Sequence, residues 1–544
     1  MTARFAPFAP TIKKIKRPET LVVALFMVMV ALINPLGETL YGPDDWSYAL
    51  TVRNLLDTGV YHTHDWSVSN IMAQAYWGAL FSKLLGYSLV SLRLSTLALA
   101  GVGSVSLYFL ARELDFDRSV SSLIAACWLA SPLVAQYSFT FMTDIPFVTL
   151  IILSFLLYSR AWRLSSYWLA GAASIAVAAS ILVRQSGVAL IPGVFLIWLW
   201  PHGQPRRWRL ALAGGALPVM VGIWQAADGL LMPNWGTRWA SAEQSRYVSA
   251  VGPFLLEAAW RVVNILQNLV FFCSPLLAAL AIDFMRALKP PGYARRQLML
   301  VTALIAFVLA FSVIGVRMMG KNGAPFLILY WPLPLTLAML AVTLLGGALL
   351  ARLAIMSPWL ADRRLLYIGV STLCLAGFVL ITFKIIDRYI IALLPCALLL
   401  LARPLASQSA RWKLVAVIVL LAQAGFTVLW LRGQFARMDT AWAQAEKLRL
   451  SGVSLPQIAG PFEWTAYQGA FDDYLAQYRD SPQASYDDFI FRWLPERALR
   501  ATYIVHTPLD EPVSERDFKV IAKIPYQDKL SWSYVIIYQR VAPP

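Results

Sequence analysis

The sequence predicts an all-α polytopic membrane protein with about 13 transmembrane helices and a small C-terminal α+β domain. Three observations predict this fold class. The 544 residues are 59% hydrophobic and only 14% charged, whereas about a quarter of the residues of a soluble domain are charged. The apolar residues form runs of about 17–25 residues, the length that crosses a bilayer core. Basic residues gather in alternate loops, which is typical of membrane proteins. A soluble enzyme, a disordered chain and a disulfide scaffold are excluded.

The first apolar run covers about residues 20–36 and follows the basic residues Lys13, Lys14, Lys16 and Arg17. No small-x-small cleavage site comes after it, so we predict an uncleaved first helix. Residues 37–87 then form the first outer loop. Further runs lie at roughly 88–111, 119–137, 143–160, 166–183, 185–200, 209–231, 257–285, 297–316, 324–350, 365–383, 388–402 and 411–432.

The loop charges predict the orientation. With the N-terminus in the cytoplasm, the cytoplasmic segments hold 22 Lys and Arg residues and the opposite loops hold 9. This bias is the positive-inside signal, so the net charge of +16 does not indicate nucleic-acid binding. An odd number of spans then places the C-terminal part outside. We expect a multi-pass protein of the inner (plasma) membrane, with a periplasmic or extracellular C-terminal domain.

Residues 433–544 differ in composition from the rest. They hold 12 Lys and Arg and 14 Asp and Glu residues, and no apolar run long enough to cross a membrane. Short β-like runs occur at 501–505 and 532–538, with turn residues between them. The sequence therefore predicts two domains, a membrane domain over 1–432 and a soluble extracytoplasmic domain over 433–544.

Charged residues at the predicted outer edge of the membrane are the best candidates for chemistry. Each charge next to lipid costs roughly 2.5–3.5 kcal/mol, so such residues need a reason to be there. Asp44 and Asp45 follow the first span, and Asp144 begins the fourth. On the same side lie Arg184, Gln185, Arg317, Lys321, Lys384, Asp387, Arg388 and Tyr389. Carboxylates beside cations suit a lipid-linked phosphate substrate, because the cations neutralise the phosphate and a carboxylate accepts a proton.

Several motifs resemble the GT-C glycosyltransferases, and most closely the protein O-mannosyltransferase and aminoarabinose transferase (glycosyltransferase family 39-like) group. The stretch Asp44-Asp45-Trp46-Ser47-Tyr48-Ala49, followed by Gly59, resembles the first outer loop of that group. Asp144 in Met-Thr-Asp-Ile-Pro resembles its second acidic site. Three further matches are Arg388-Tyr389 before Leu394-Pro395, Glu463-Trp464, and Tyr474.

The resemblance implies an inverting transfer of one sugar from a polyprenyl-phosphate donor to a hydroxyl of a glycolipid, polysaccharide or protein on the outer face. Asp44 would be the general base, and Asp45 and Asp144 would orient it, the acceptor or a cation. Arg388 would bind the donor phosphate with Arg184 or Lys384, next to Tyr389.

One stretch departs from the family pattern. The aminoarabinose transferases carry Glu-Lys-Pro where this chain reads Ile71-Met72-Ala73, and that lysine is thought to touch the donor phosphate. Its absence argues against aminoarabinose transfer as such. Arg53, Gln74 and Lys83 are the candidates to replace it.

Other interpretations stay open at this point. The three aspartates could instead be helix N-caps, which is a common position for Asp. The basic residues Arg184, Arg388 and Lys384 could instead anchor the ends of spans at the membrane surface. Trp46, Trp66, Trp235 and Trp239 are predicted to lie in interfacial belts. The alternative functions are a polysaccharide polymerase or ligase with a diphosphate-linked donor and, ranked last, a transporter. We expect a monomer in the bilayer that needs no cofactor, although paired carboxylates also suit a divalent cation.

Overall fold

The computed structural model describes residues 18–199, 208–231, 233–249, 251–287, 346–347, 350, 362–382, 387–406, 410–481, 484–507, 513–514, 516–528 and 531–541. The predicted span at 297–316 and almost all of that at 324–350 lie outside the described residues. The same is true of Arg317, Lys321 and Lys384.

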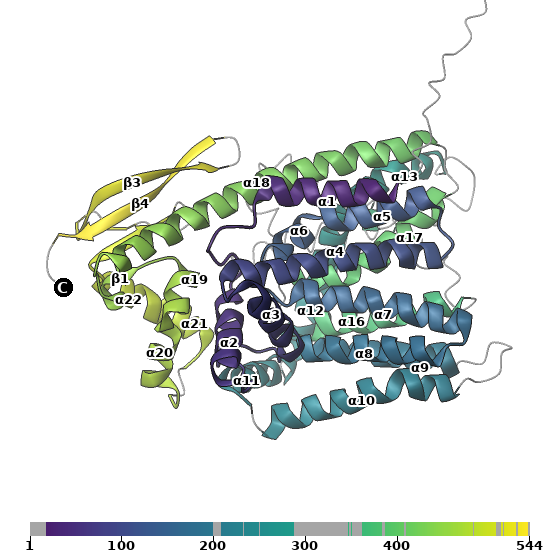
Figure 1. Ribbon diagram of the computed structural model, residues 1–544, viewed down its shortest axis with the longest axis horizontal. Helices are drawn as coiled ribbons and strands as arrows, with labels where there is room; N and C mark the ends of the chain where they lie inside the picture. The colour runs from purple at the N-terminus through teal and green to yellow at the C-terminus, as the bar shows by residue number, and fades with distance from the viewer. Residues whose placement is uncertain are drawn as a thin grey trace, which may run out of the picture.

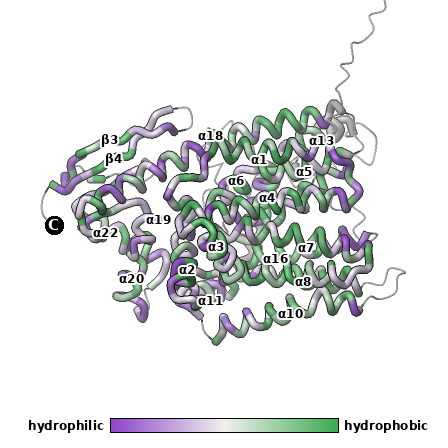
Figure 2. Tube along the Cα trace, in the orientation of Figure 1, coloured by the Kyte–Doolittle hydropathy of each residue, from purple (hydrophilic) through white to green (hydrophobic). Residues whose placement is uncertain are grey.

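A bundle of roughly parallel helices forms most of the molecule (Figure 1). Green, hydrophobic segments follow these helices, and hydrophilic segments gather at the ends of the bundle (Figure 2). The bundle contains α1 (Glu19–Ile33), α4 (Leu89–Glu113), α5 (Arg118–Ala130), α6 (Pro132–Ser138), α7 (Asp144–Leu164), α8 (Tyr167–Val183), η1 (Gln185–Leu190), α9 (Ile191–Leu199), α10 (Trp208–Leu231), α12 (Val251–Phe272), α13 (Ser274–Ala287), α16 (Arg363–Ile381), η3 (Asp387–Leu393), α17 (Leu394–Ala406) and α18 (Ala410–Leu450).

Six of the described helices are long and apolar enough to cross a membrane, or seven if one bent pair counts as a span. The bent pair is α5 and α6, which meet at 66°, and Pro132 begins the second helix because proline cannot continue the first. The predicted run at 257–285 is divided into α12 and α13. The total of 13 spans stays a prediction, because two of the predicted spans lie almost wholly outside the described residues.

Three short helices lie across one end of the bundle, at the left in Figure 1. They are α2 (Asp45–Thr58) and α3 (Met72–Leu85), both from the predicted first outer loop, and α11 (Trp235–Ser249). None of them is apolar and long enough to be a membrane span. Asp44 directly precedes α2, and Trp66 lies in the segment between α2 and α3.

Ion pairs join the segments at the opposite end of the bundle. Glu113 at the end of α4 lies 2.8 Å from Arg163 and 3.4 Å from Arg160 of α7. Its side chain is 2% exposed, whereas those of Arg163 and Arg160 are 57% and 38% exposed, so a buried carboxylate pairs with partly exposed cations. Two further pairs connect predicted cytoplasmic loops, Arg364 with Asp115 at 3.2 Å and Lys413 with Asp117 at 2.9 Å. The segments that the charge pattern assigned to one side therefore meet at one end.

The C-terminal part follows α18, which runs for 41 residues and passes without a break through the predicted domain boundary at 432. A four-stranded sheet in the order β1-β2-β4-β3 confirms the strands predicted near 501–505 and 532–538. The elements are η4 (Leu455–Gln457), β1 (Ile458–Ala459), α19 (Phe462–Thr465), η5 (Ala466–Ala470), α20 (Phe471–Tyr478), α21 (Tyr486–Asp488), η6 (Phe489–Trp493), α22 (Leu494–Arg500), β2 (Tyr503–His506), β3 (Phe518–Asp528) and β4 (Ser531–Arg540).

A buried arginine holds the loop that leads into α2. Arg93 of α4 is 2% exposed, and its guanidinium donates to the carbonyl oxygens of Gly37 at 2.7 Å and Thr39 at 2.5 Å, and also to that of Pro35. Its Nε donates to the carbonyl of Phe139 at 3.0 Å. One side chain thus ties the segment before Asp44 to the segment before Asp144.

We expect Arg93→Met to lower the thermal unfolding temperature of the detergent-solubilised protein. The substitution keeps the apolar stem but leaves several buried carbonyl groups without a donor, at about 1–3 kcal/mol for each group left unpaired. Intrinsic fluorescence during heating measures the effect. Arg118→Met, at an exposed position of α5, is the control and should unfold like the wild type. Equal unfolding temperatures for both variants would refute this role of Arg93.

Candidate functional site

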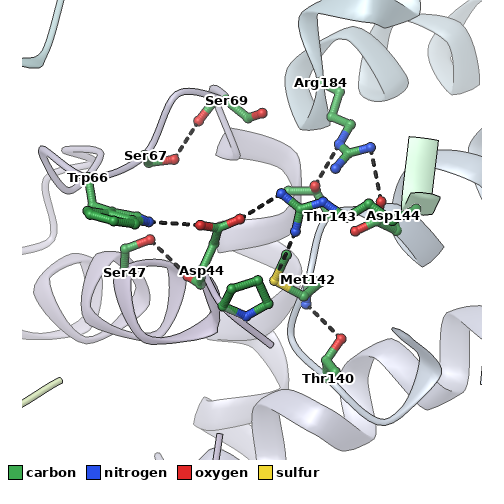
Figure 3. Close-up of polar contacts among 12 residues, drawn as sticks. Asp44, Ser47, Trp66, Ser67, Ser69, Thr140, Met142, Thr143, Asp144 and Arg184 are labelled. Carbon is green, nitrogen blue, oxygen red and sulfur yellow. Dashed lines mark hydrogen bonds and ion pairs between the residues drawn. The ribbon is translucent and has the colours of Figure 1, made fainter. Parts of the chain in front are cut away.

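Asp44 lies at the start of α2 and faces two partners. Its Oδ1 accepts a hydrogen bond from the indole Nε1 of Trp66 at 2.8 Å, and its Oδ2 lies 2.7 Å from Nη2 of Arg388. Figure 3 shows the carboxylate between the indole and a guanidinium. The side chain makes no capping hydrogen bond to the amides of α2. The N-cap interpretation therefore does not account for this carboxylate.

A second ion pair lies beside the first. Asp144, the first residue of α7, lies 3.0 Å from Nη1 of Arg184, and Nε of Arg184 donates to the Thr143 hydroxyl at 2.7 Å (Figure 3). The ring of Tyr389 connects the two pairs, because its centroid is 5.1 Å from the guanidinium carbon of Arg184 and 5.8 Å from that of Arg388. The structure thus brings together five of the residues predicted from the sequence.

Asp45 is buried beneath the turn that carries Asp44. Its side chain accepts a hydrogen bond from the Gly42 amide at 3.0 Å. A Cβ on Gly42 would lie 2.6 Å from an Asp45 carboxylate oxygen, so this turn requires glycine. Burial raises the pKa of Asp45 to about 7, against the opposing effects of the Gly42 and Phe141 amides. Asp45 is therefore positioned to stabilise the turn that precedes α2 and carries Asp44.

We expect Asp45→Asn to gain stability relative to the wild type as the pH rises from 5 to 8. The folded protein keeps a proton on Asp45 up to a pKa of about 7, whereas the carboxyl of the unfolded chain has the ordinary value of 3.8. The stability that the wild type gains from this group is therefore present at low pH, falls by up to about 1.4 kcal/mol per pH unit as the pH rises from 3.8 towards 7, and changes no further above 7. Asparagine does not titrate. Unfolding temperatures at several pH values measure the difference, and a difference independent of pH would contradict the assignment.

The two arginines of these ion pairs, Arg184 and Arg388, line a cavity of about 1440 Å³. Asp44, Arg184, Arg388 and Tyr389 line it together with Trp66. Next to the cations the wall is apolar, and it is formed by Phe147, Val188, Leu375, Phe378, Val379 and Ala392. An anionic headgroup with a hydrocarbon tail fits this combination of paired cations and apolar wall.

One predicted phosphate-binding residue, Arg53, does not join this arrangement. Arg53 does not line the cavity. It is exposed on the other face of α2, and its Nε lies 3.9 Å from Asp57. The buried face of that helix is formed instead by residues such as Tyr48 and Val52, so the helical period turns Arg53 outward. Lys384 lies outside the described residues.

Trp66 belongs to the candidate site, although its sequence pattern did not predict it there. The prediction of an interfacial belt is wrong for Trp46, Trp66 and Trp235, which are at most 6% exposed and pack inside the protein. The Trp66 carbonyl also accepts a hydrogen bond from the hydroxyl of Tyr486, a residue of the C-terminal part. The only signal in the sequence is that Trp66 shares the first outer loop with Asp44.

Metal ligands do not gather in the described part of the chain. Within it, no group of three or more His, Cys, Asp and Glu side chains could hold a metal ion. The carboxylates of Asp44 and Asp144 each face an arginine instead.

One family model matches a part of this chain. Residues 72–224 match the family model of dolichyl-phosphate-mannose-protein mannosyltransferases, a range that includes Asp144 and Arg184. No curated protein matches the sequence. The crystal structure of ArnT from Cupriavidus metallidurans bound to undecaprenyl phosphate is similar with 15% identity, over 96% of this chain and 98% of that one, at a TM-score of 0.45.

A second similar structure is the oligosaccharyltransferase of Archaeoglobus fulgidus in complex with Zn and sulfate. It shares 14% identity over 95% of this chain and 73% of that one, at a TM-score of 0.46. The resemblance predicted from the motifs is confirmed by the family match. Over residues 72–224 the chain is similar to the dolichyl-phosphate-mannose-protein mannosyltransferase family.

Proposed function

We propose that this chain is an inverting GT-C glycosyltransferase, which moves one sugar from a polyprenyl-phosphate donor to a hydroxyl group of an envelope acceptor. The observation that carries the proposal is the Asp44–Arg388 pair at 2.7 Å on the wall of the large cavity. In this proposal Asp44 is the base and Arg388 the phosphate-binding cation next to it, and the apolar wall beside them supports binding of a lipid tail. The family match over residues 72–224 supports the same reaction class.

In the proposed reaction Asp44 removes the proton from the acceptor hydroxyl while that oxygen attacks the anomeric carbon of the donor sugar. The new oxygen–carbon bond forms as the bond from that carbon to the phosphate oxygen breaks. Polyprenyl phosphate leaves with the electron pair, and the anomeric configuration inverts. Arg388 and Arg184 stabilise the negative charge that grows on the phosphate. Trp66 fixes the rotamer of Asp44 through the hydrogen bond to Oδ1.

The donor also changes the partner of Asp44 in this proposal. Arg388 bonds the Asp44 carboxylate at 2.7 Å, and a donor phosphate competes for the same guanidinium. Arg388 then turns to the phosphate and releases Oδ2 of Asp44, which becomes free to accept the proton. The base is therefore available only when the donor is bound, which limits side reactions.

The membrane orientation belongs to the same proposal. We propose a cytoplasmic N-terminus, a catalytic membrane domain over 1–432, and a domain over 433–544 on the extracytoplasmic face of the inner membrane. The bias of 22 to 9 basic residues supports this orientation. A C-terminal tag should be accessible from outside intact spheroplasts, and a tag accessible only after lysis would reverse the orientation.

Mass spectrometry of lipid-linked sugars and envelope glycans, in cells with and without the protein, tests the function. We expect loss of one sugar from a glycan and accumulation of the matching polyprenyl-phosphate sugar. A donor that accumulates as a polyprenyl diphosphate would instead favour a polymerase or ligase. Unchanged glycans and lipids would refute the proposal.

A further inference from the structure

Part of the cavity wall carries hydroxyl and amide groups in place of charges. Thr237, Ser241 and Ser245 of α11 line the cavity at intervals of four residues, so their hydroxyls follow one face of the helix. Ser69 and Asn70 of the first outer loop line it as well. These side chains both donate and accept hydrogen bonds, as a ligand with many hydroxyl groups requires.

A buried amide on α10 also lines the cavity. Gln225 is 6% exposed, and its Oε1 has no hydrogen-bond partner among the described residues. A buried polar atom without a partner costs free energy, and a ligand hydroxyl that donates to Oε1 would satisfy it. Gln225 is therefore independent support for a polar ligand in the cavity.

The charges of the cavity disfavour an anionic ligand on this wall. Among the described lining residues the Lys and Arg residues are only Arg184 and Arg388. Each of these already faces a carboxylate, and the proposed donor phosphate needs both. Asp228 of α10 adds a negative group to the wall. Among the described lining residues, a phosphorylated acceptor would meet this carboxylate and no further cation.

Aromatic rings complete the wall. Tyr486 packs between Trp66 and Trp239, with ring centroids at 4.3 Å and 4.2 Å, and all three residues line the cavity. Aromatic rings combine an apolar surface with a polar edge, which suits the C–H and hydroxyl groups of a sugar. None of the described lining residues belongs to a strand, so a peptide has no sheet edge to extend there.

We propose that this wall is the acceptor subsite, and that the acceptor is a neutral oligosaccharide. The subsite consists of the α11 hydroxyls, Gln225 and the three aromatic residues. Its role as an acceptor site rests on the proposed function, because Asp44 on the same cavity is the base that would activate the bound hydroxyl.

Binding of the detergent-solubilised full-length protein to an array tests the subsite. The array carries neutral hexose oligosaccharides, the same oligosaccharides with phosphate groups, and peptides rich in Ser and Thr. We expect the protein to prefer the neutral oligosaccharides. The double variant Gln225→Leu/Thr237→Val, which removes two hydrogen-bonding groups at nearly constant volume, should bind them about tenfold more weakly. Thr58→Val and Gln527→Leu make the same changes at positions outside the cavity and should bind like the wild type.

Stronger binding of the phosphorylated oligosaccharides or of the peptides would overturn the proposal, as would no binding of any neutral oligosaccharide. Equal binding by the double variant and the controls would also overturn it, provided that the variant keeps the wild-type unfolding temperature. A variant that unfolds early is replaced by Ser241→Ala/Ser245→Ala on the exposed α11 face. Binding of undecaprenyl phosphate is measured in parallel. Its absence together with intact oligosaccharide binding would refute the proposed function but not the subsite.

Discussion

Asp44→Asn is expected to reduce sugar transfer by about 10²–10⁴-fold, the usual contribution of a general base. Asparagine has nearly the same shape, and its Oδ1 can still accept the hydrogen bond from Trp66, but it cannot take a proton from the acceptor. The measurement is the release of polyprenyl phosphate from lipid-linked donor isolated from native membranes, with the variant reconstituted in nanodiscs.

Asp57→Asn is the matched control, because Asp57 lies on the same helix with a side chain that is 67% exposed. This variant should retain wild-type turnover. The unfolding temperatures of both variants show whether the fold is intact. Turnover of Asp44→Asn within about threefold of the wild type would remove Asp44 as the base, since a general base contributes far more than that.

Arg388→Ala is expected to weaken binding of undecaprenyl phosphate by about 10–100-fold. The Arg388 side chain is 7% exposed and lines the cavity together with Arg184, and a hydrogen bond to a charged group is worth about 1.5–3 kcal/mol. Arg388→Lys should restore part of the affinity, because lysine keeps the charge but not the forked geometry. Quenching of the protein fluorescence by titrated undecaprenyl phosphate measures the affinity.

Arg53→Ala separates the sequence prediction from the observed geometry. Arg53 was a candidate for the donor phosphate, but its side chain is 58% exposed and pairs with Asp57. This variant should bind undecaprenyl phosphate like the wild type. Unchanged affinity in Arg388→Ala together with a loss in Arg53→Ala would reassign the phosphate site to the other face of α2.

The sequence predicted the acidic residues of the site better than their partners. Asp44 and Asp144 stand out because each follows or begins an apolar run, where a charge is costly. The sequence predicts Arg388 on the same side of the membrane, but the residues around it in the sequence do not show which carboxylate it pairs with. Its partner Asp44 is 344 positions away in the sequence. Contacts over such separations depend on how the helices pack.

Local patterns of the sequence by themselves determined the membrane-protein class, most of the long described helices and two of the four described strands, β2 and β4. Hydropathy and charge act on each segment where it stands, so they can be read along the chain. Only the tertiary structure decided that Trp66 donates a hydrogen bond to Asp44 and that Tyr486 of the C-terminal part contacts Trp66. It also decided that Arg53 points away from the cavity. These outcomes depend on helix rotation and on the packing of distant segments, which hydropathy and charge along the chain do not specify.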